Sequence, residues 1–392
     1  MDQLRPGVRR FWALLGAHAI LVMVVSYALR PALSYAVLDL GYGSVWPAVL
    51  TAAFAVPPLI LALTTGRLVD RVGERPGMLL GAVFLVVACL VAWAGARHLA
   101  ALIVSTALLG VGIIFSMVGE QSAVAGRARA GGLDSTLGVY TFLTSLGQML
   151  GPLLLLIPPR PGSLVPPLPP IALACAVASV LILLTSCGFG GTRTAPVVAD
   201  TGTWSAPRLL GLPGMWRAML VSGLILASID VALAYLPALV HARGIAPYWL
   251  TAMLAARAVA QMLSRINLGR LSERFGRRGL TMVCCAVSAL ALGGLTVPAP
   301  IAVLIALAAV YGFTAGVCQP LTMAWVTELA PSGTRGTVLS LRLAGNRIAQ
   351  TLIPAITGAA AATTGVSGVL MVTGATLGVA AWSAAAIPRP PT

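Results

Sequence analysis

The sequence predicts an all-α membrane protein whose twelve transmembrane helices form two pseudo-symmetric six-helix bundles. Three observations support this fold class. Hydrophobic residues make up 58% of the chain and charged residues only 9%, whereas a soluble domain has roughly 25% charged residues. Twelve apolar stretches approach the length of about 20 residues that a bilayer-spanning helix needs. A ten-residue polar loop also recurs at matching places in the two halves of the chain.

The predicted spans follow one another with little sequence between them. Their approximate ranges are 11–38, 46–66, 77–96, 99–122, 136–157, 170–190, 214–240, 247–267, 279–297, 300–325, 337–359 and 365–387. The longest remainder, 191–213, contains Gly, Thr and isolated charges, and we expect it to be a cytoplasmic linker. It separates an N-terminal six-helix bundle, residues 1–190, from a C-terminal bundle, residues 214–392.

Basic charge is spread between the spans rather than gathered in a patch. All 25 basic residues are arginine, and no basic run exceeds two residues, although the net charge is +15. This distribution argues against nucleic-acid binding, which uses a clustered basic surface. With the N-terminus inside, eighteen arginines lie in or beside cytoplasmic segments, and only Arg97, Arg160 and Arg243 lie outside. The positive-inside rule thus predicts a multi-pass protein of the inner (plasma) membrane with both termini in the cytoplasm.

The chain carries no pattern typical of an enzyme. HExxH, GxSxG and Walker motifs are absent, and His18, His98 and His241 lie in three separate segments. The six cysteines lie within apolar stretches and include no CxxC pair, which is neither a disulfide framework nor a metal-site pattern. We therefore expect no enzymatic activity, no catalytic residue, no cofactor and no metal, in a monomer surrounded by the lipid bilayer.

The repeated loop is the clearest evidence of duplication. Gly66–Arg75 reads GRLVDRVGER, and Gly269–Arg278 reads GRLSERFGRR, at an offset of 203 residues. Spans five and eleven share a Gln and a Pro at an offset of 202, and spans one and seven share a Leu-x-Tyr at an offset of 200. Nearly equal offsets along the chain indicate two copies of one half.

The loop has a physical logic beyond its basic charge. We expect Gly66 to end its helix and Gly73 to supply a positive φ in a short turn. The acid of each copy, Asp70 or Glu273, can lie near a helix N-terminus and pair with arginine. A purely topogenic loop is the alternative, but it would explain only the arginines.

This loop, placed between spans two and three of a six-plus-six chain, resembles the signature loop of the major facilitator superfamily. The resemblance implies the major facilitator fold, transport by alternating access, and a loop that acts as a cytoplasmic latch between helices. Glu74 departs from the family pattern, which usually has a base there. The gating residues that the resemblance implies are Gly66, Asp70, Arg71, Gly73, Arg75, Gly269, Glu273, Arg274 and Gly276.

Span five contains Gly138, Gly147, Gly151 and Pro152, which resembles the span-five motif of the twelve-span drug:proton antiporters. In that family the motif separates exporters from importers, so it implies efflux by an antiporter. The match is partial, because two leucines replace the closing Gly-Gly. Span four also has Thr106 where the antiporters carry an arginine. The alternative is a small-residue face that only packs helices together.

Apart from Arg217 and Arg265, which are counted with the cytoplasmic segments, six charged residues lie within the predicted spans, where a charge needs a partner or a cavity. They are Arg30, Glu120, Asp230, Arg257, Arg342 and Arg347. Arg30 and Asp230 are 200 residues apart and occupy equivalent positions, so we predict that they meet as an outer gate or a binding pair; a static ion pair is the alternative. Glu120 and Asp230 are the candidates for proton coupling. For Glu120 the alternative is an interfacial acid paired with a loop arginine or with Arg342.

Polar residues also recur at helical spacing in three spans, as expected for helices that face a cavity or bind one another by hydrogen bonds. These stripes are Arg342, Asn346 and Gln350 with Arg347, then Arg257, Gln261 and Ser264, and lastly Tyr140, Thr144 and Gln148. The residues we expect in substrate binding or the outer gate are Arg30, Asp230, Arg257, Gln261, Asn346, Arg347 and Gln350.

Four arginines against two acids leave the interior of the spans positively charged, which favours anionic or zwitterionic cargo. The sequence therefore predicts a proton-coupled exporter of a small metabolite or drug-like molecule. The alternatives are an uptake permease for an organic anion and a non-transporting membrane sensor.

Overall fold

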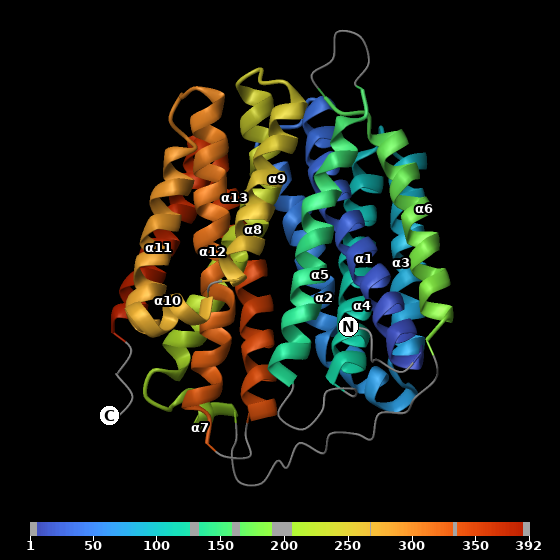
Figure 1. Cartoon of the computed structure of the whole chain (residues 1–392). Coiled ribbons are helices and arrows are strands. Elements are labelled where there is room, and N and C mark those ends of the chain that lie inside the picture. Colours follow the sequence, from blue (N-terminus) through green and yellow to red (C-terminus); the bar gives the residue numbers. More distant parts are fainter. Residues whose placement is uncertain are drawn as a thin grey trace. The chain divides into compact units, whose positions relative to one another are not determined.

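The structure of the chain is a computed structural model that describes residues 6–125, 133–158, 165–189, 206–266, 268–331 and 335–386. All regular structure in these ranges is helical (Figure 1). The helices are α1 (Pro6–Asp39), α2 (Trp46–Val72), α3 (Glu74–Ala94), α4 (Leu99–Ala125), α5 (Leu133–Leu150), the 3₁₀ helix η1 (Gly151–Leu156), α6 (Leu168–Cys187), α7 (Ala206–Leu210), α8 (Met215–Ala242), α9 (Pro247–Ile266), α10 (Leu268–Phe275), α11 (Arg277–Gly294), α12 (Ile301–Leu329) and α13 (Arg335–Ala385).

Each predicted span coincides with helical structure. Span five consists of α5 followed by η1, and spans eleven and twelve both fall within α13. Gly365 divides α13 into these two spans, since its φ of 63° and ψ of −167° are not helical. Glycine adopts this conformation without the steric clash that a Cβ would cause, so the chain can turn sharply there.

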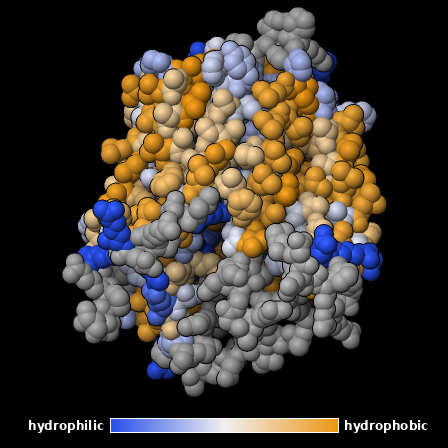
Figure 2. All heavy atoms as spheres, viewed as in Figure 1, coloured by the Kyte–Doolittle hydropathy of each residue, from blue (hydrophilic) through white to orange (hydrophobic). Residues whose placement is uncertain are grey.

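The outer surfaces of the helices suit a lipid environment. Among the described residues, eight helices are long and apolar enough to cross a membrane. Large apolar side chains are exposed along α3, α6, α11 and α13, and Leu290 has an exposed fraction of 75%. Figure 2 shows apolar side chains covering the helix surfaces in that view. Such extensive apolar exposure is untypical of proteins in water, and the chain is a multi-pass membrane protein.

Some predicted spans are less apolar because they contain the polar stripes. In the described ranges, α2, α9, α11 and the first part of α13 are not among the eight helices that are long and apolar enough to cross a membrane, and α9 and α13 carry polar stripes. These segments carry Arg257 and Gln261 on α9, and Arg342, Asn346 and Gln350 on α13. Polar residues are tolerated in membrane helices where they face protein or water rather than lipid, and these side chains are largely buried.

The chain divides into two compact units. Unit 1 consists of Met1–Tyr42 and Ala53–Val197, and unit 2 consists of Gly43–Ala52 and Val198–Thr392. The start of α2 is thus grouped with unit 2, where the Ser44 hydroxyl donates a hydrogen bond of 3.2 Å to the carbonyl oxygen of Ala361. Of the predicted linker, residues 191–205 lie outside the described ranges. In the remainder the short helix α7 forms, and its Leu209 is completely buried.

The two units use the same pattern of helix packing. In unit 1, α3 packs against α4 and α6, while α1 packs against α5 and α6. In unit 2, α11 packs against α12 and α13, while α8 packs along α13. The helices α1, α3 and α4 of unit 1 thus correspond to α8, α11 and α12 of unit 2, as the repeat in the sequence predicts.

A pair of glycines marks this equivalence at the level of single residues. A Cβ at Gly110 on α4 would overlap the carbonyl oxygen of Phe54 on α2, and a Cβ at Gly312 on α12 would overlap that of Arg257 on α9. The offsets between the two contacts are those of the repeat. Each helix pair can therefore approach to backbone contact only because glycine has no side chain.

Candidate functional site

Glu120, near the end of α4, lies at the centre of a buried hydrogen-bonded cluster in unit 1. Its Oε1 lies 2.6 Å from Nδ1 of His18 on α1. Its Oε2 accepts a hydrogen bond of 2.8 Å from the hydroxyl of Tyr140 on α5. The side chains of His18 and Glu120 both have an exposed fraction of 0%. Among the described residues, the partners of the two carboxylate oxygens are thus a histidine and a tyrosine, and not the arginine that the alternative for Glu120 named.

His18 is the functional candidate that the sequence analysis missed. It lies within a long apolar span, where a polar side chain needs a partner, and this was the available signal. Its partner is 102 residues away in the chain, however, so no local spacing could identify the pair. Only the packing of α1 against α4 and α5 brings the three side chains together.

In unit 2, Asp230 on α8 accepts a hydrogen bond of 2.6 Å from the side-chain amide of Gln350 on α13. The side-chain oxygen of Gln350 in turn accepts a bond of 3.2 Å from the guanidinium of Arg347. Asp230 has an exposed fraction of 6%, so this chain of donors and acceptors lies inside the unit. The structure thus brings together three of the residues expected in substrate binding.

The polar stripe of α9 is buried against α12. Arg257 has an exposed fraction of 2%, and its guanidinium donates a hydrogen bond of 3.2 Å to the side-chain oxygen of Gln261. A Cβ at Gly316 on α12 would lie 2.5 Å from the hydroxyl of Ser264 and 2.9 Å from Cγ of Gln261. The polar residues of this stripe lie on one face of α9, and part of that face packs against α12.

Helix-to-helix hydrogen bonds also account for part of the stripe on α13. The guanidinium of Arg342 donates bonds of 3.2 Å to the carbonyl oxygen of Gln319 and to the hydroxyl of Thr322, both on α12. Asn346 is buried on the same face, and its Oδ1 has no hydrogen-bond partner among the described residues. A buried amide oxygen without a partner is costly, so Asn346 is suited to receive a ligand.

Arg30 lies within unit 1 and is also buried. Its guanidinium carbon lies 4.1 Å from the centroid of the Phe54 ring, which is a cation–π contact. Phe54 contacts Gly110 as Arg257 contacts Gly312, so Phe54 and Arg257 are equivalent positions of the two units. Arg30 and Asp230 are equivalent positions by the offset of the repeat. Arg30 and Asp230 belong to different units, and their predicted approach to one another stays a prediction.

In the first copy of the repeated loop the helix ends later than predicted. In both copies a glycine forms the turn. Helix α2 continues through Gly66 to Val72, so the prediction that Gly66 ends its helix is wrong. The turn lies instead at Gly73, which precedes α3 with a φ of 93°. Its equivalent Gly276 precedes α11 with a φ of 69°. Gly73 thus has the positive φ that the sequence predicted, and its equivalent Gly276 shares it.

The charged residues of the two loops have different surroundings. Glu74 is almost completely buried in the first turn of α3, where a carboxylate is favoured by the helix dipole. In the second copy, Arg277 forms an ion pair with Glu328 at the end of α12, and Arg278 donates a hydrogen bond to the carbonyl oxygen of Ala385. Arg71 and Arg274 are exposed, and Arg75 is half-buried. The structure places Asp70 in α2, and Gly269 and Glu273 in α10. The surroundings of these three residues lie outside what the structure describes.

Replacing Gly276 with alanine is expected to lower the free energy of unfolding by about 1–3 kcal/mol, the cost of a strained backbone conformation. The cost comes from the positive φ alone, because nothing lies within 4 Å of a Cβ placed at Gly276. Gly279→Ala is the matched control, since that site is equally open and no unusual φ is recorded there. Thermal unfolding in detergent measures both, and equal midpoints would contradict the prediction.

The glycines of the span-five motif have unequal roles in packing. A Cβ at Gly147 would overlap the carbonyl oxygen of Ile20 on α1, and a Cβ at Gly151 would lie 2.9 Å from the carbonyl oxygen of Val24. Nothing lies within 4 Å of a Cβ at Gly138. The helix changes to 3₁₀ form at Gly151, with Pro152 in its first turn. The motif therefore gives α5 a close and bent contact with α1.

Comparisons with known proteins agree with this architecture. A family model described as Major Facilitator Superfamily matches residues 15–301 and 218–392. No curated protein matches the sequence. The solved structures similar to the chain include a mutant of the nucleoside transporter NupG, with a TM-score of 0.77 and 11% identity over 95% of this chain and 98% of that one.

Two further structures are similar over nearly the whole chain. The xylose transporter XylE of E. coli, in an inward-open conformation, has a TM-score of 0.73 and 15% identity over 95% of both chains. The human organic anion transporter MFSD10 has a TM-score of 0.68 and 18% identity over 97% of this chain and 100% of that one. At these identities the similarity shows a shared fold.

Proposed function

The chain belongs to the major facilitator superfamily, and from this premise we propose that it exports a small anionic or zwitterionic molecule in exchange for protons. Family membership makes it a transporter and not an enzyme. The coupling ion, the direction and the cargo are the proposal. Each is supported by its own observation, and the mechanism we infer is alternating access.

The observation that carries the cargo class is the charge of the polar residues inside the spans of unit 2. The cationic side chains there are the buried Arg257 and the half-buried Arg342 and Arg347, and the acid is Asp230. A buried excess of positive charge favours a ligand that brings a negative group. Asp230 gives the same group one anionic oxygen pair, which suits the ammonium of a zwitterion. A lipophilic cation would meet three arginines and is disfavoured.

Proton coupling is supported by the two acids inside the spans. Glu120 and Asp230 are both buried, and a buried carboxylate that gains or loses a proton changes the charge inside the membrane by one unit. Export is supported by the resemblance of Gly138, Gly147, Gly151 and Pro152 to the span-five motif of antiporters. The close contact of Gly147 and Gly151 with α1 is common to that motif and to a simple packing face.

The repeated loops support the proposed topology and gate. Their exposed arginines suit the cytoplasmic side under the positive-inside rule. We infer from this that both termini are cytoplasmic and that the protein lies in the inner membrane. The turns at Gly73 and Gly276 join α2 to α3 and α10 to α11. We infer that these turns and their charged neighbours form the cytoplasmic gate, with Arg30 and Asp230 contributing to cargo binding or to the outer gate.

Proton release from everted membrane vesicles tests the proposal. Respiration acidifies the vesicle lumen, and a quenched pH-sensitive dye reports protons that leave in exchange for added cargo. The probes are a panel of aromatic carboxylates, N-acyl amino acids and zwitterionic fluoroquinolones, with tetraphenylphosphonium as the cationic comparison. We expect dequenching with at least one anion or zwitterion and none with tetraphenylphosphonium. Vesicles without the protein give the background.

Right-side-out vesicles distinguish the rival function. An uptake permease that carries an organic anion with protons would make the external medium more alkaline when the anion is added. That result, without dequenching in everted vesicles, would overturn the export proposal. Dequenching by tetraphenylphosphonium alone would overturn the cargo class.

A further inference from the structure

We propose that His18, Glu120 and Tyr140 together form the proton-binding site of unit 1, with His18 and Glu120 sharing the transported proton and Tyr140 positioning the carboxylate. This rests on the proposed proton coupling and goes beyond it by naming the site. The three side chains come from α1, α4 and α5, and the two ionisable partners, His18 and Glu120, are fully buried.

The short contact between His18 and Glu120 requires a proton between them. A carboxylate oxygen and a bare imidazole nitrogen both present lone pairs, and two acceptors do not approach to 2.6 Å. At least one proton therefore lies on this line. With that proton alone, the cluster carries one negative charge, held by hydrogen bonds from His18 and Tyr140. With a second proton on Nε2 of His18 and the first held by Glu120, the imidazole and the carboxyl group are both uncharged and the cluster is neutral.

In this conformation the cluster is left with an unfavourable feature whether it holds one proton or two. Nε2 of His18 is buried and has no hydrogen-bond partner in the described ranges. A second proton there would be an unpaired donor, which is costly when buried. Without it, the cluster holds an uncompensated negative charge within the membrane, which is also costly. A site that is unsatisfied in either state favours a conformational change that gives Nε2 a partner or brings it into contact with water.

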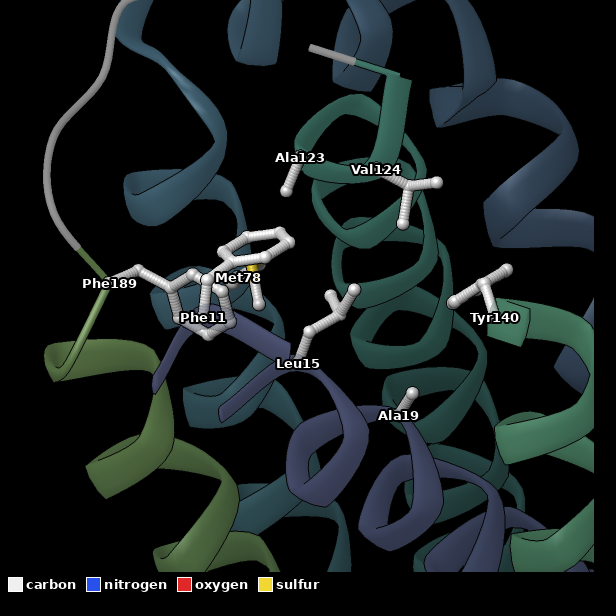
Figure 3. Close-up of a cluster of buried hydrophobic side chains, with 8 residues drawn as sticks. All are labelled: Phe11, Leu15, Ala19, Met78, Ala123, Val124, Tyr140 and Phe189. Atoms are coloured by element: carbon white, nitrogen blue, oxygen red, sulfur yellow. The ribbon is translucent and has the colours of Figure 1, made fainter. Parts of the chain in front are cut away.

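Apolar side chains lie beside the proposed proton-binding site and exclude water there. Phe11, Leu15, Ala19, Met78, Ala123, Val124, Tyr140 and Phe189 form a buried apolar cluster around the ends of α1, α4 and α5 (Figure 3). The ring of Phe189 meets the imidazole of His18 edge to face, with 6.3 Å between the ring centroids. A proton on this site is therefore kept from uncontrolled exchange with solvent.

Other charged groups near the site belong mainly to α3. Glu74 and Arg75 lie in its first turn, and a Cβ at Gly119 would lie 3.1 Å from the carbonyl oxygen of Glu74. On α1, Arg9 and Arg10 are exposed, and on α6 the thiol of Cys187 is exposed. Glu120 thus follows directly after Gly119, the residue of α4 that contacts the start of α3. The start of α3 adjoins the turn at Gly73. We infer that proton binding acts on this gate through that contact.

Infrared difference spectroscopy of the purified protein detects the site without any cargo. Titration between alkaline and acid pH should produce a protonated-carboxyl band, which Glu120→Gln removes and the control Glu328→Gln retains. His18→Gln should shift the midpoint of this band, whereas His98→Gln, at an exposed position, should not. Tyr140→Phe should move the midpoint to higher pH, because it removes a donor that stabilises the carboxylate. Tyr248→Phe is its exposed control.

Transport assays then separate a proton site from a structural ion pair. We expect Glu120→Gln and His18→Gln to reduce cargo-driven proton release about tenfold or more. Cargo counterflow without a pH gradient should stay near the wild-type rate. If counterflow and the unfolding temperature fall together with proton release in these variants and in Tyr140→Phe, the cluster is structural and the proposal is overturned.

The two proposals fail in different ways. If wild-type protein exchanges cargo for protons but the carboxyl band is unchanged in Glu120→Gln, this proton site is wrong and the proposed function stands. If Glu120 binds a proton but no compound drives proton release, the proton site stands and the proposed exchange is wrong.

Discussion

Replacing Asp230 with asparagine is expected to raise the KM for cargo about tenfold or more, the effect of losing a charge-assisted hydrogen bond that contributes about 1.5–3 kcal/mol. Asparagine has nearly the shape of aspartate, and its side-chain oxygen can still accept the bond from Gln350. The chain of donors from Arg347 through Gln350 would stay intact. The charge alone is removed, so the variant should fold.

The compound with the strongest response in everted vesicles is the probe for this measurement. Asp39→Asn, at an exposed position after the predicted cargo-binding part of α1, is the matched control and should transport as wild type does. Asp230→Ala should be worse than Asp230→Asn, because it also leaves the amide of Gln350 without its acceptor. An unchanged KM in Asp230→Asn would contradict a role for this carboxylate in cargo binding.

Replacing Gly110 or Gly312 with alanine is expected to lower the free energy of unfolding by about 1–3 kcal/mol, the usual cost of an inserted group in a packed interior. In each case the new Cβ would overlap a backbone carbonyl oxygen, of Phe54 or of Arg257, which cannot turn away as a side chain could. The helices must separate instead, and transport should fall with stability.

Gly293→Ala and Gly138→Ala are the controls, since nothing lies within 4 Å of a Cβ at either position. Thermal unfolding in detergent compares the four variants in the same background. The equivalence of the two units predicts similar losses at Gly110 and Gly312. Midpoints for these variants that match those of the controls would show that the helices separate at little cost.

The sequence predicted the helices well because the membrane restricts the chain to few solutions. Backbone groups in lipid must bond within their own helix, so an apolar stretch of sufficient length is helical almost regardless of its details. The ends were less accurate. Helix α2 extends six residues beyond the predicted end at Gly66, because loss of apolar character marks the membrane boundary and not the end of the helix.

The site was predicted in part. A stripe of polar residues at helical spacing identified Gln350, and its charge within a span identified Asp230. The structure joins the two by a hydrogen bond. The partners of Glu120 were not identified. His18 belongs to another helix, and a sequence pattern records which face of a helix is polar but not which helix lies opposite.

The sequence by itself determined that this chain is a duplicated helical membrane protein, since hydropathy and a fixed offset are properties of the order of residues. It also determined the positive φ of Gly73, because a short turn requires glycine locally, and the repeat carries the same turn to Gly276. Only the tertiary structure decided that His18 and Tyr140 meet Glu120, and that Arg342 is held by α12. These contacts join segments 20 to 102 residues apart, and they exist because buried polar groups must find partners wherever helix packing provides them.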